Sequence, residues 1–178
     1  GNAMALPFPE SAFDLVLCQH GLPFFPDRGQ AVREIRRVVA PQGRVLTIVL
    51  QALAKHPVFE ALMESVARHL ALPLADVMTP FALSDADVLG GLFTAAGFRR
   101  VDILAESTVV RFPAPERFVP LAVASSAAAV PAFTQLQAPA RAALLEAVRL
   151  DVEPVLRSYR DSEAVTFPMY AHVVMAMK

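Results

Sequence analysis

Apolar and polar positions follow two periods along the chain, one typical of buried strands and the other of amphipathic helices. Residues 13–18 form a short apolar run with a single acid, and residues 45–50 form a second run rich in β-branched residues. Each run predicts a strand, the first of them buried on both faces. Val32, Ile35 and Val39 stand between them at helical spacing. Strand, helix and strand with short connections predict a parallel βαβ unit.

Capping residues predict where the helices begin and end. Asp27 is a suitable N-cap with Gln30 three residues later, and Pro41 and Gly43 should end that helix. Ser84 is the predicted cap of a later helix. Gly97 should end this later helix in the left-handed position after the last turn.

The remaining pattern predicts further helices and two more strands. Apolar positions at helical spacing cover residues 59–70, and Pro115 and Pro139 stand at first-turn positions of two later helices. The second of these should kink or end near Pro154. Residues 101–112 and 165–177 predict the third and fourth strands. Strands mixed with helices in this order indicate a layered α/β fold.

Composition narrows the class of protein. The chain has 178 residues, of which 55 % are hydrophobic and 19 % charged, and its net charge is −1. A length of this size predicts one domain, and the apolar excess suggests that something covers part of its surface. Near-neutral charge gives no electrostatic case for nucleic-acid binding. Residues 118–140 lack charged side chains and contain three prolines, which favours buried or interfacial helical segments over a membrane span.

Few side chains suggest chemistry. Cys18 is the only cysteine, which excludes an internal disulfide and a zinc-type cluster and fits a reducing, cytoplasmic setting; we expect it to be a packed hydrophobe. His20 follows the first strand, where it is a candidate base or substrate contact or a polar loop residue. Phe24 and Phe25 either contact an apolar substrate or anchor the loop to the core.

Four segments in order carry a family resemblance: residues 2–14, 18–28, 33–44 and 83–98. The first is similar to a "D-A-x-x-L-P-F-x-D-x-x-F-D" pattern and the third to an "E-x-x-R-V-L-x-P-G-G" turn. Together they resemble class I S-adenosylmethionine (SAM)-dependent methyltransferases, especially those akin to the enzymes of ubiquinone and menaquinone biosynthesis. The resemblance is strongest over residues 2–50.

The resemblance implies a Rossmann-like α/β sheet with helices on both faces. The strands present would be the fourth to seventh of that sheet, with the last antiparallel between the fifth and the sixth. Residues 1–178 would then form a single truncated methyltransferase-like domain, its C-terminal half, with an added helical segment over about 113–162.

The resemblance also implies a cofactor site and an acceptor site. Asn2, Ala3, Gln19 and Gly21 match positions around SAM, although Asn2 stands where the family has Asp. Phe24 and Phe25 match positions near a small, apolar methyl acceptor. None of the seven glycines forms the family's G-x-G turn after a strand, so we expect this chain alone to be inactive.

A fold without its first three strands leaves residues 13–18 as an apolar edge, which is a template for pairing. We therefore expect a homodimer formed through this edge. Two alternatives to an enzyme remain: a non-catalytic module for dimerisation or partner binding derived from the fold, and a small-molecule binder with an apolar pocket in the helical segment.

Overall fold

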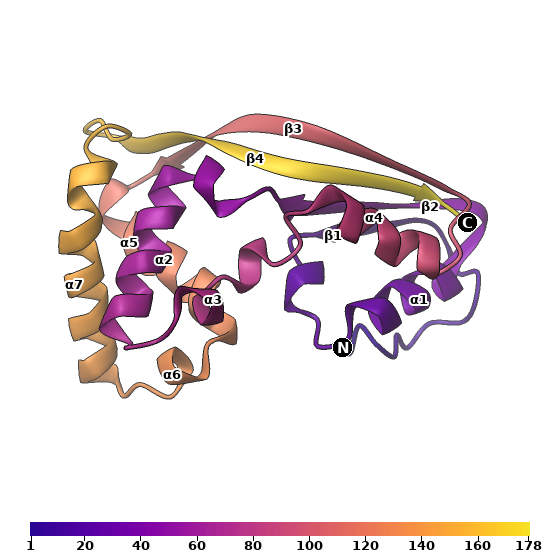
Figure 1. Ribbon diagram of the computed structural model, residues 1–178, viewed down its shortest axis with the longest axis horizontal. Helices are drawn as coiled ribbons and strands as arrows, with labels where there is room; N and C mark the ends of the chain where they lie inside the picture. The colour runs from indigo at the N-terminus through magenta and orange to yellow at the C-terminus, as the bar shows by residue number, and fades with distance from the viewer. The chain divides into compact units, whose positions relative to one another are not determined.

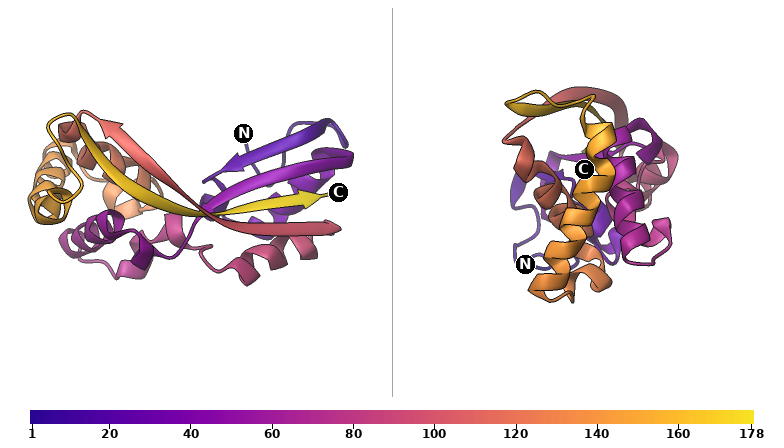
Figure 2. Two further views of the ribbon diagram at one scale, coloured as in Figure 1. Left: turned by 90° about the horizontal axis from the view of Figure 1, so that it is seen from above. Right: turned by 90° about the vertical axis from the view of Figure 1, so that its left-hand side faces the viewer.

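The computed structural model describes all residues, 1–178, and divides them into two compact units. The first unit consists of Gly1–Ala52, Pro80–Glu106 and Tyr170–Lys178, and the second of Leu53–Thr79 and Ser107–Met169. One sheet has the strand order β1-β2-β4-β3 (Figure 2). Its strands are β1 (Phe13–Gln19), β2 (Val39–Leu50), β3 (Arg100–Pro113) and β4 (Ala164–Met177) (Figure 1). The long strands β3 and β4 contribute residues to both units.

Seven α-helices complete the fold. Their bounds are α1 (Arg28–Val38), α2 (Pro57–His69), α3 (Leu74–Val77), α4 (Ala86–Ala95), α5 (Pro115–Ser126), α6 (Pro131–Thr134) and α7 (Ala138–Leu156). The prediction for residues 59–70 is confirmed by α2, whereas the one-turn helices α3 and α6 were not predicted. Helix α7 ends two residues after Pro154, as its proline indicated.

The predicted βαβ unit is confirmed. Strand β1 pairs with β2 in parallel, and the Asp27 side chain accepts a hydrogen bond of 2.8 Å from the backbone N–H of Gln30 at the start of α1. The apolar stripe of α1 is buried. The helix ends at Val38, and the chain is already extended at Pro41 and Gly43, which therefore belong to an early part of β2.

The position of the last strand is also confirmed. Strand β4 lies between β2 and β3 and is antiparallel to β2, with Arg44 opposite Met177 and Leu50 opposite Ala171. The numbering of the strands as four to seven remains a prediction.

The N-cap of helix α4 lies one residue later than predicted. Asp85, not Ser84, has the extended backbone of an N-cap, and its carboxylate accepts hydrogen bonds from the N–H groups of Asp87 and Val88. The Ser84 carbonyl instead faces the His172 ring at 2.9 Å. Gly97 follows the helix with φ +89°, as predicted.

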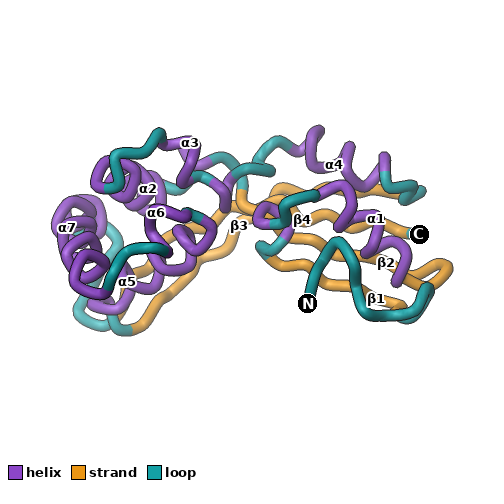
Figure 3. The backbone as a smooth tube through the Cα atoms, turned by 90° about the horizontal axis from the view of Figure 1, so that it is seen from below, coloured by secondary structure: helices purple, strands orange, loops and turns teal.

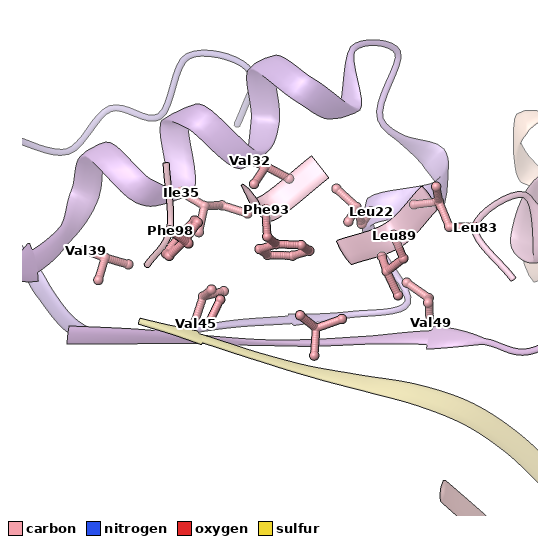
Figure 4. Packing of buried hydrophobic residues seen from close by; sticks show 12 residues of the cluster. Leu22, Val32, Ile35, Val39, Val45, Val49, Leu83, Leu89, Phe93 and Phe98 are labelled. Carbon is pink, nitrogen blue, oxygen red and sulfur yellow. The ribbon is translucent and has the colours of Figure 1, made fainter. Parts of the chain in front are cut away.

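The core of the first unit lies between one face of the sheet and two helices (Figure 3). Figure 4 shows Val32 and Ile35 of α1 and Phe93 of α4 pointing toward Val45 of β2. Both helices of this unit therefore pack on the same face of the sheet. The expectation of helices on both faces is wrong for this unit, because no element of the unit covers the opposite face.

Strand β1 is correspondingly one-sided. Val16 and Cys18 pack against the core, whereas Leu15 and Leu17 are 50 % and 65 % exposed. The prediction of a strand buried on both faces is wrong, because burial depends on a second layer that is absent here. On the open face the strand register gives two rows: Leu17, Leu46 and Met175, and Leu15, Arg44 and Met177.

The second unit is mainly helical. Helix α2 packs against α7 and α5, and the unit joins the expected segment 113–162 to Leu53–Thr79. The stretch 118–140 forms α5, α6 and the start of α7, with Phe118, Val123 and Phe133 buried. None of the helices combines the length and the apolar character that crossing a membrane requires.

Candidate functional site

The candidate site lies at the carboxyl end of β1, in the first unit. The strand ends at Gln19, and His20 turns the chain with a left-handed backbone, φ 53°. Its N–H still donates to the carbonyl of Ile48 on β2, at 2.8 Å. The following 3-10 turn, Leu22–Phe24, buries Leu22 and Pro23. The backbone of the loop is thus held at both ends.

His20 has the chemistry of a candidate base. Its Nδ1 is buried and has no hydrogen-bond partner, so exchange of a proton with a ligand falls to Nε2. Burial lowers the pKa of His20 below its ordinary value of 6.5. A lowered pKa keeps the ring neutral near pH 7, which is the form that can accept a proton.

Gln19 and Gly21 flank this histidine. Gln19 is exposed and pairs in register with Ile48 on the open face. A Cβ atom at Gly21 would meet Cys18 Sγ and Phe25 Cζ only at 3.5 Å, ordinary contact distances. Neither crowding nor a positive φ therefore requires glycine at this position.

The two phenylalanines of the loop differ in their surroundings. Phe25 is half-buried and packs against the core cluster of the unit, which favours an anchoring role. Phe24 is also half-buried, and its N–H donates to the Gly21 carbonyl at 3.0 Å; it does not join the core cluster.

The N-terminal segment runs along α1 and brings Asn2 and Ala3 toward the same end. Arg37 donates to the carbonyls of Leu6 and Phe8, and further toward the start of α1 Gln30 donates to Met4. The segment therefore runs in the same direction as α1, and its first residues lie near the helix start, which follows the candidate loop. The Asn2 carboxamide oxygen accepts the Met4 N–H at 3.0 Å, so it is used locally.

Glu34 holds the N-terminal segment against α1 through an ion pair and a hydrogen bond. Its carboxylate receives the Arg37 guanidinium at 2.8 Å and the Leu6 N–H at 2.9 Å. These contacts, that of Arg37 first, lower the pKa of Glu34 from 4.5 to about 2. The charge on Glu34 therefore persists at any physiological pH and keeps the N-terminal segment docked.

Cys18 is the last residue of β1 that faces the core. Burial raises the pKa of its thiol, partly opposed by the N–H groups of Leu22 and Gly21. A raised pKa disfavours the reactive thiolate, which agrees with the prediction of a packed side chain. No cluster of three or more metal-ligating side chains occurs in the structure.

Comparison with known proteins finds similarity to methyltransferases. Residues 1–47 match the methyltransferase domain family. The chain is 34 % identical over 117 residues to the demethylmenaquinone methyltransferase of Lactococcus lactis, covering 57 % of this chain and 45 % of the relative. It is 49 % identical over 47 residues to the ubiquinone/menaquinone biosynthesis C-methyltransferase UbiE of Hahella chejuensis, covering 26 % and 19 %.

The chain is similar in sequence to SAM-dependent methyltransferases. Solved structures agree on the fold. A protein of Anabaena variabilis, assigned as a methyltransferase from an antibiotic biosynthesis pathway, superposes with a TM-score of 0.53 at 15 % identity over 99 % of this chain and 71 % of its own. A Bacillus halodurans protein assigned as a methyltransferase gives 0.50 at 14 % identity, over 100 % and 75 %. The chain spans less than half the length of the curated relatives named above.

The structure has a loop at a strand end but no glycine-rich turn after a strand. The loop 19–21 lies at the carboxyl end of a strand, where ligands bind in such sheets. Gly97, the one glycine with a positive φ, follows helix α4 and not a strand. No glycine-rich turn after a strand is present to let the backbone approach the methionine part.

The sequence did not reveal an aromatic cluster in the second unit. Phe118 lies 5.5 Å from Phe112 and 5.4 Å from Phe167, and Phe59 lies 5.8 Å from Phe167, measured between ring centroids. The four rings come from α2, β3, α5 and β4. Their clustering therefore could not be predicted from residue spacing within one segment. The high phenylalanine content, 12 residues with no tryptophan, was the one signal in the sequence.

Proposed function

We propose that this chain forms the acceptor-side portion of a SAM-dependent methyltransferase that acts on a small, apolar molecule. The carrying observation is the loop after β1, where Gln19, His20 and Gly21 meet at the strand end in a chain whose first 47 residues match a methyltransferase domain. Methyl transfer from SAM asks the protein mainly to align the acceptor, because the sulfonium is already activated. A sparse constellation of catalytic groups suits that reaction.

Within this site we assign roles to the loop residues. Gln19, Gly21 and the N-terminal pair Asn2 and Ala3 would contact SAM. The absence of a steric need for glycine at position 21 supports a role in leaving room for a ligand. Phe24 would contact the acceptor, together with the exposed edge of Phe25. His20 would take a proton from the acceptor through Nε2.

We also propose that these 178 residues alone do not bind SAM productively. The test is a calorimetric titration of the purified chain with S-adenosylhomocysteine, run beside the Lactococcus lactis relative as the positive control. We expect heats of dilution only from the chain. Binding in the micromolar range would contradict the incomplete site and assign enzyme activity to the chain itself.

The gene around the chain tests the methyltransferase assignment separately. Coding sequence upstream of Gly1 that predicts a strand followed by a G-x-G turn is the expected result. An initiation site at Met4 would contradict the proposal that the chain is a portion of such an enzyme.

We further propose that a second copy covers the free edge of β1, residues Phe13–Cys18, in a homodimer. This strand is at the end of the sheet and pairs only with β2. Unpaired N–H and C=O groups on such an edge favour pairing with another strand, and two-fold symmetry would let the two β1 strands meet antiparallel.

A further inference from the structure

An apolar groove lies within the second unit, apart from the loop after β1. It encloses about 380 Å³ and is lined by residues of α2, β3, α5 and β4. Ligand pockets in proteins measure roughly 300–1,000 Å³, so the groove has the size for a small molecule. We call it the aromatic groove; its main lining residues are Phe59, Phe112, Phe118, Leu121, Ser125 and Phe167.

The walls of the groove are ordered by contacts between the rings. Phe118 and Phe167 are buried and form the floor. Phe59 and Phe112 are half-buried, and they pack edge-to-face on the floor rings at interplanar angles of 75° for Phe59 on Phe167 and 69° for Phe112 on Phe118. Edge-to-face packing fixes ring orientation, so the groove is preformed and does not have to be assembled by a ligand.

No charged side chain lines the aromatic groove. The single polar side chain is Ser125, whose hydroxyl donates to the Ala122 carbonyl at 3.0 Å. Its oxygen keeps its two lone pairs for accepting hydrogen bonds. An ionised ligand would lose its hydration without gaining a partner here, which is unfavourable. The chemistry of the lining therefore favours an uncharged molecule with few hydrogen-bond donors.

A neighbouring hollow in the same unit does not compete for this role. It is larger, about 810 Å³, but is lined by Glu116, Glu153, Asp161, Arg149 and Arg160. Its ions are already engaged, with Arg160 at 2.9 Å from Glu153 and Arg149 at 2.7 Å from Glu146. Surface ion pairs of this kind are common and need no ligand to explain them.

We propose that the aromatic groove is a binding site for a small, uncharged aromatic molecule. Flat rings offer the faces and edges that the four phenylalanines can stack against. The volume of about 380 Å³ lies within the range of small-molecule pockets, which favours such a ligand. The inference rests on the groove alone, so it stands or fails independently of methyl transfer and of SAM binding.

The test is a fluorescence titration of the full chain with N-phenyl-1-naphthylamine, an uncharged probe that brightens in apolar sites. The chain has no tryptophan, so its own emission interferes little. We expect saturable one-to-one binding. The sulfonated analogue 1-anilinonaphthalene-8-sulfonate carries a similar ring system with a negative charge, and we expect it to bind about tenfold more weakly. Equal or tighter binding of the sulfonate would overturn the selectivity for uncharged molecules.

Two matched variants locate the site. Ser125→Phe fills the groove from an exposed position of α5, and Ala124→Phe places the same ring on the same helix at an exposed residue outside the lining. We expect Ser125→Phe to weaken binding of the uncharged probe about tenfold and Ala124→Phe to bind as the wild type does, with equal melting temperatures. No binding by the wild type, or equal loss in both variants, would overturn the site.

A protein partner gives a different outcome. If the wild type self-associates and Ser125→Phe alone makes it monomeric in light scattering, the groove is an interface between copies, and the small-molecule proposal is overturned.

Discussion

Gly43 shows how one residue constrains the βαβ unit. An added Cβ would lie 2.8 Å from Val39 Cγ1, 2.9 Å from the Ala40 carbonyl oxygen and 3.0 Å from the Asp14 carbonyl oxygen. Two of these atoms belong to the backbone where β1 and β2 meet, so neither can move without disturbing the strands. The small side chain is needed for this close approach.

Alanine at position 43 is therefore expected to destabilise the protein by about 1–3 kcal/mol through overpacking. The control is Gly91→Ala in α4, where no atom lies within 4 Å of the new Cβ; it should stabilise by about 0.5–1 kcal/mol, because alanine favours the helix. Urea unfolding midpoints measure both. A Gly43→Ala protein as stable as the wild type would contradict the close approach.

Local chemistry at single residues was mostly predictable from sequence. Asp27 and Gly97 were predicted because capping depends on a few neighbouring atoms. The prediction failed by one position at Ser84, since Ser84 and Asp85 are both capping residue types and the backbone angles decide between them. The left-handed backbone of His20 was not predicted, because it follows from pairing with β2.

At the scale of elements, Asp151 ties α7 to α2. One carboxylate oxygen meets Ser65 Oγ at 2.7 Å, an Arg68 nitrogen at 2.7 Å and His69 Nε2 at 2.8 Å. These contacts, that of Ser65 first, lower the pKa of Asp151 from 3.8 to about 2. The folded protein therefore favours the ionised carboxylate more than the unfolded chain does.

Because the pKa is lowered on folding, the stabilisation is complete above about pH 4 and is lost as the pH falls toward 2. Asp151→Asn should melt at a lower temperature than the wild type at pH 7, and the two should converge near pH 2. Asp76→Asn, on the exposed helix α3, is the control and should match the wild type throughout. Melting curves from pH 2 to 7 measure this effect. A melting-temperature difference between Asp151→Asn and the wild type that stays constant over this range would contradict the role of the charge.

The elements themselves were predicted well, because periodicity is a property of each segment. All four strands and the helices that open at Asp27, Pro115 and Pro139 lie where the pattern placed them. Burial of Leu15 and Leu17 was not predictable in this way. An apolar run shows that a strand can be covered on two faces, but whether a second layer exists depends on other segments.

At the scale of the whole molecule, the open face and free edge of β1 are expected to drive self-association. Leu17, 65 % exposed, stands beside Leu46 in the row that ends at Met175. A lysine there places a charge on the edge strand, which is a common device against pairing. Leu17→Lys should convert a dimer to a monomer while leaving the covered face and its core intact.

Leu150→Lys is the matched control, since Leu150 is 58 % exposed on α7 in the other unit. Size-exclusion chromatography with light scattering should give a dimer for the wild type and for Leu150→Lys. A monomeric wild type would refute the dimer, and a dimer that survives Leu17→Lys would place the contact elsewhere.

The two candidate sites differ in how far sequence could reach them. The loop after β1 is continuous, so Gln19, His20 and Gly21 are neighbours in the sequence itself and could be grouped from it. The aromatic groove gathers Phe59, Phe112, Phe118 and Phe167 from four elements, and their meeting is decided by tertiary packing. A site made of consecutive residues can be predicted from the sequence, whereas a site assembled from distant segments can be identified only from the tertiary structure.

The Cys18 thiol is a chemical probe of the loop after β1. It is the only thiol, it is half-buried at the carboxyl end of β1, and its Sγ would touch a side chain at position 21. Partial burial and a raised pKa both slow reaction of this thiol, so the alkylation rate of the native protein reports how accessible this corner beside His20 is. A molecule bound at the loop should lower the alkylation rate of Cys18, so binding can be followed by this rate without measuring enzyme turnover.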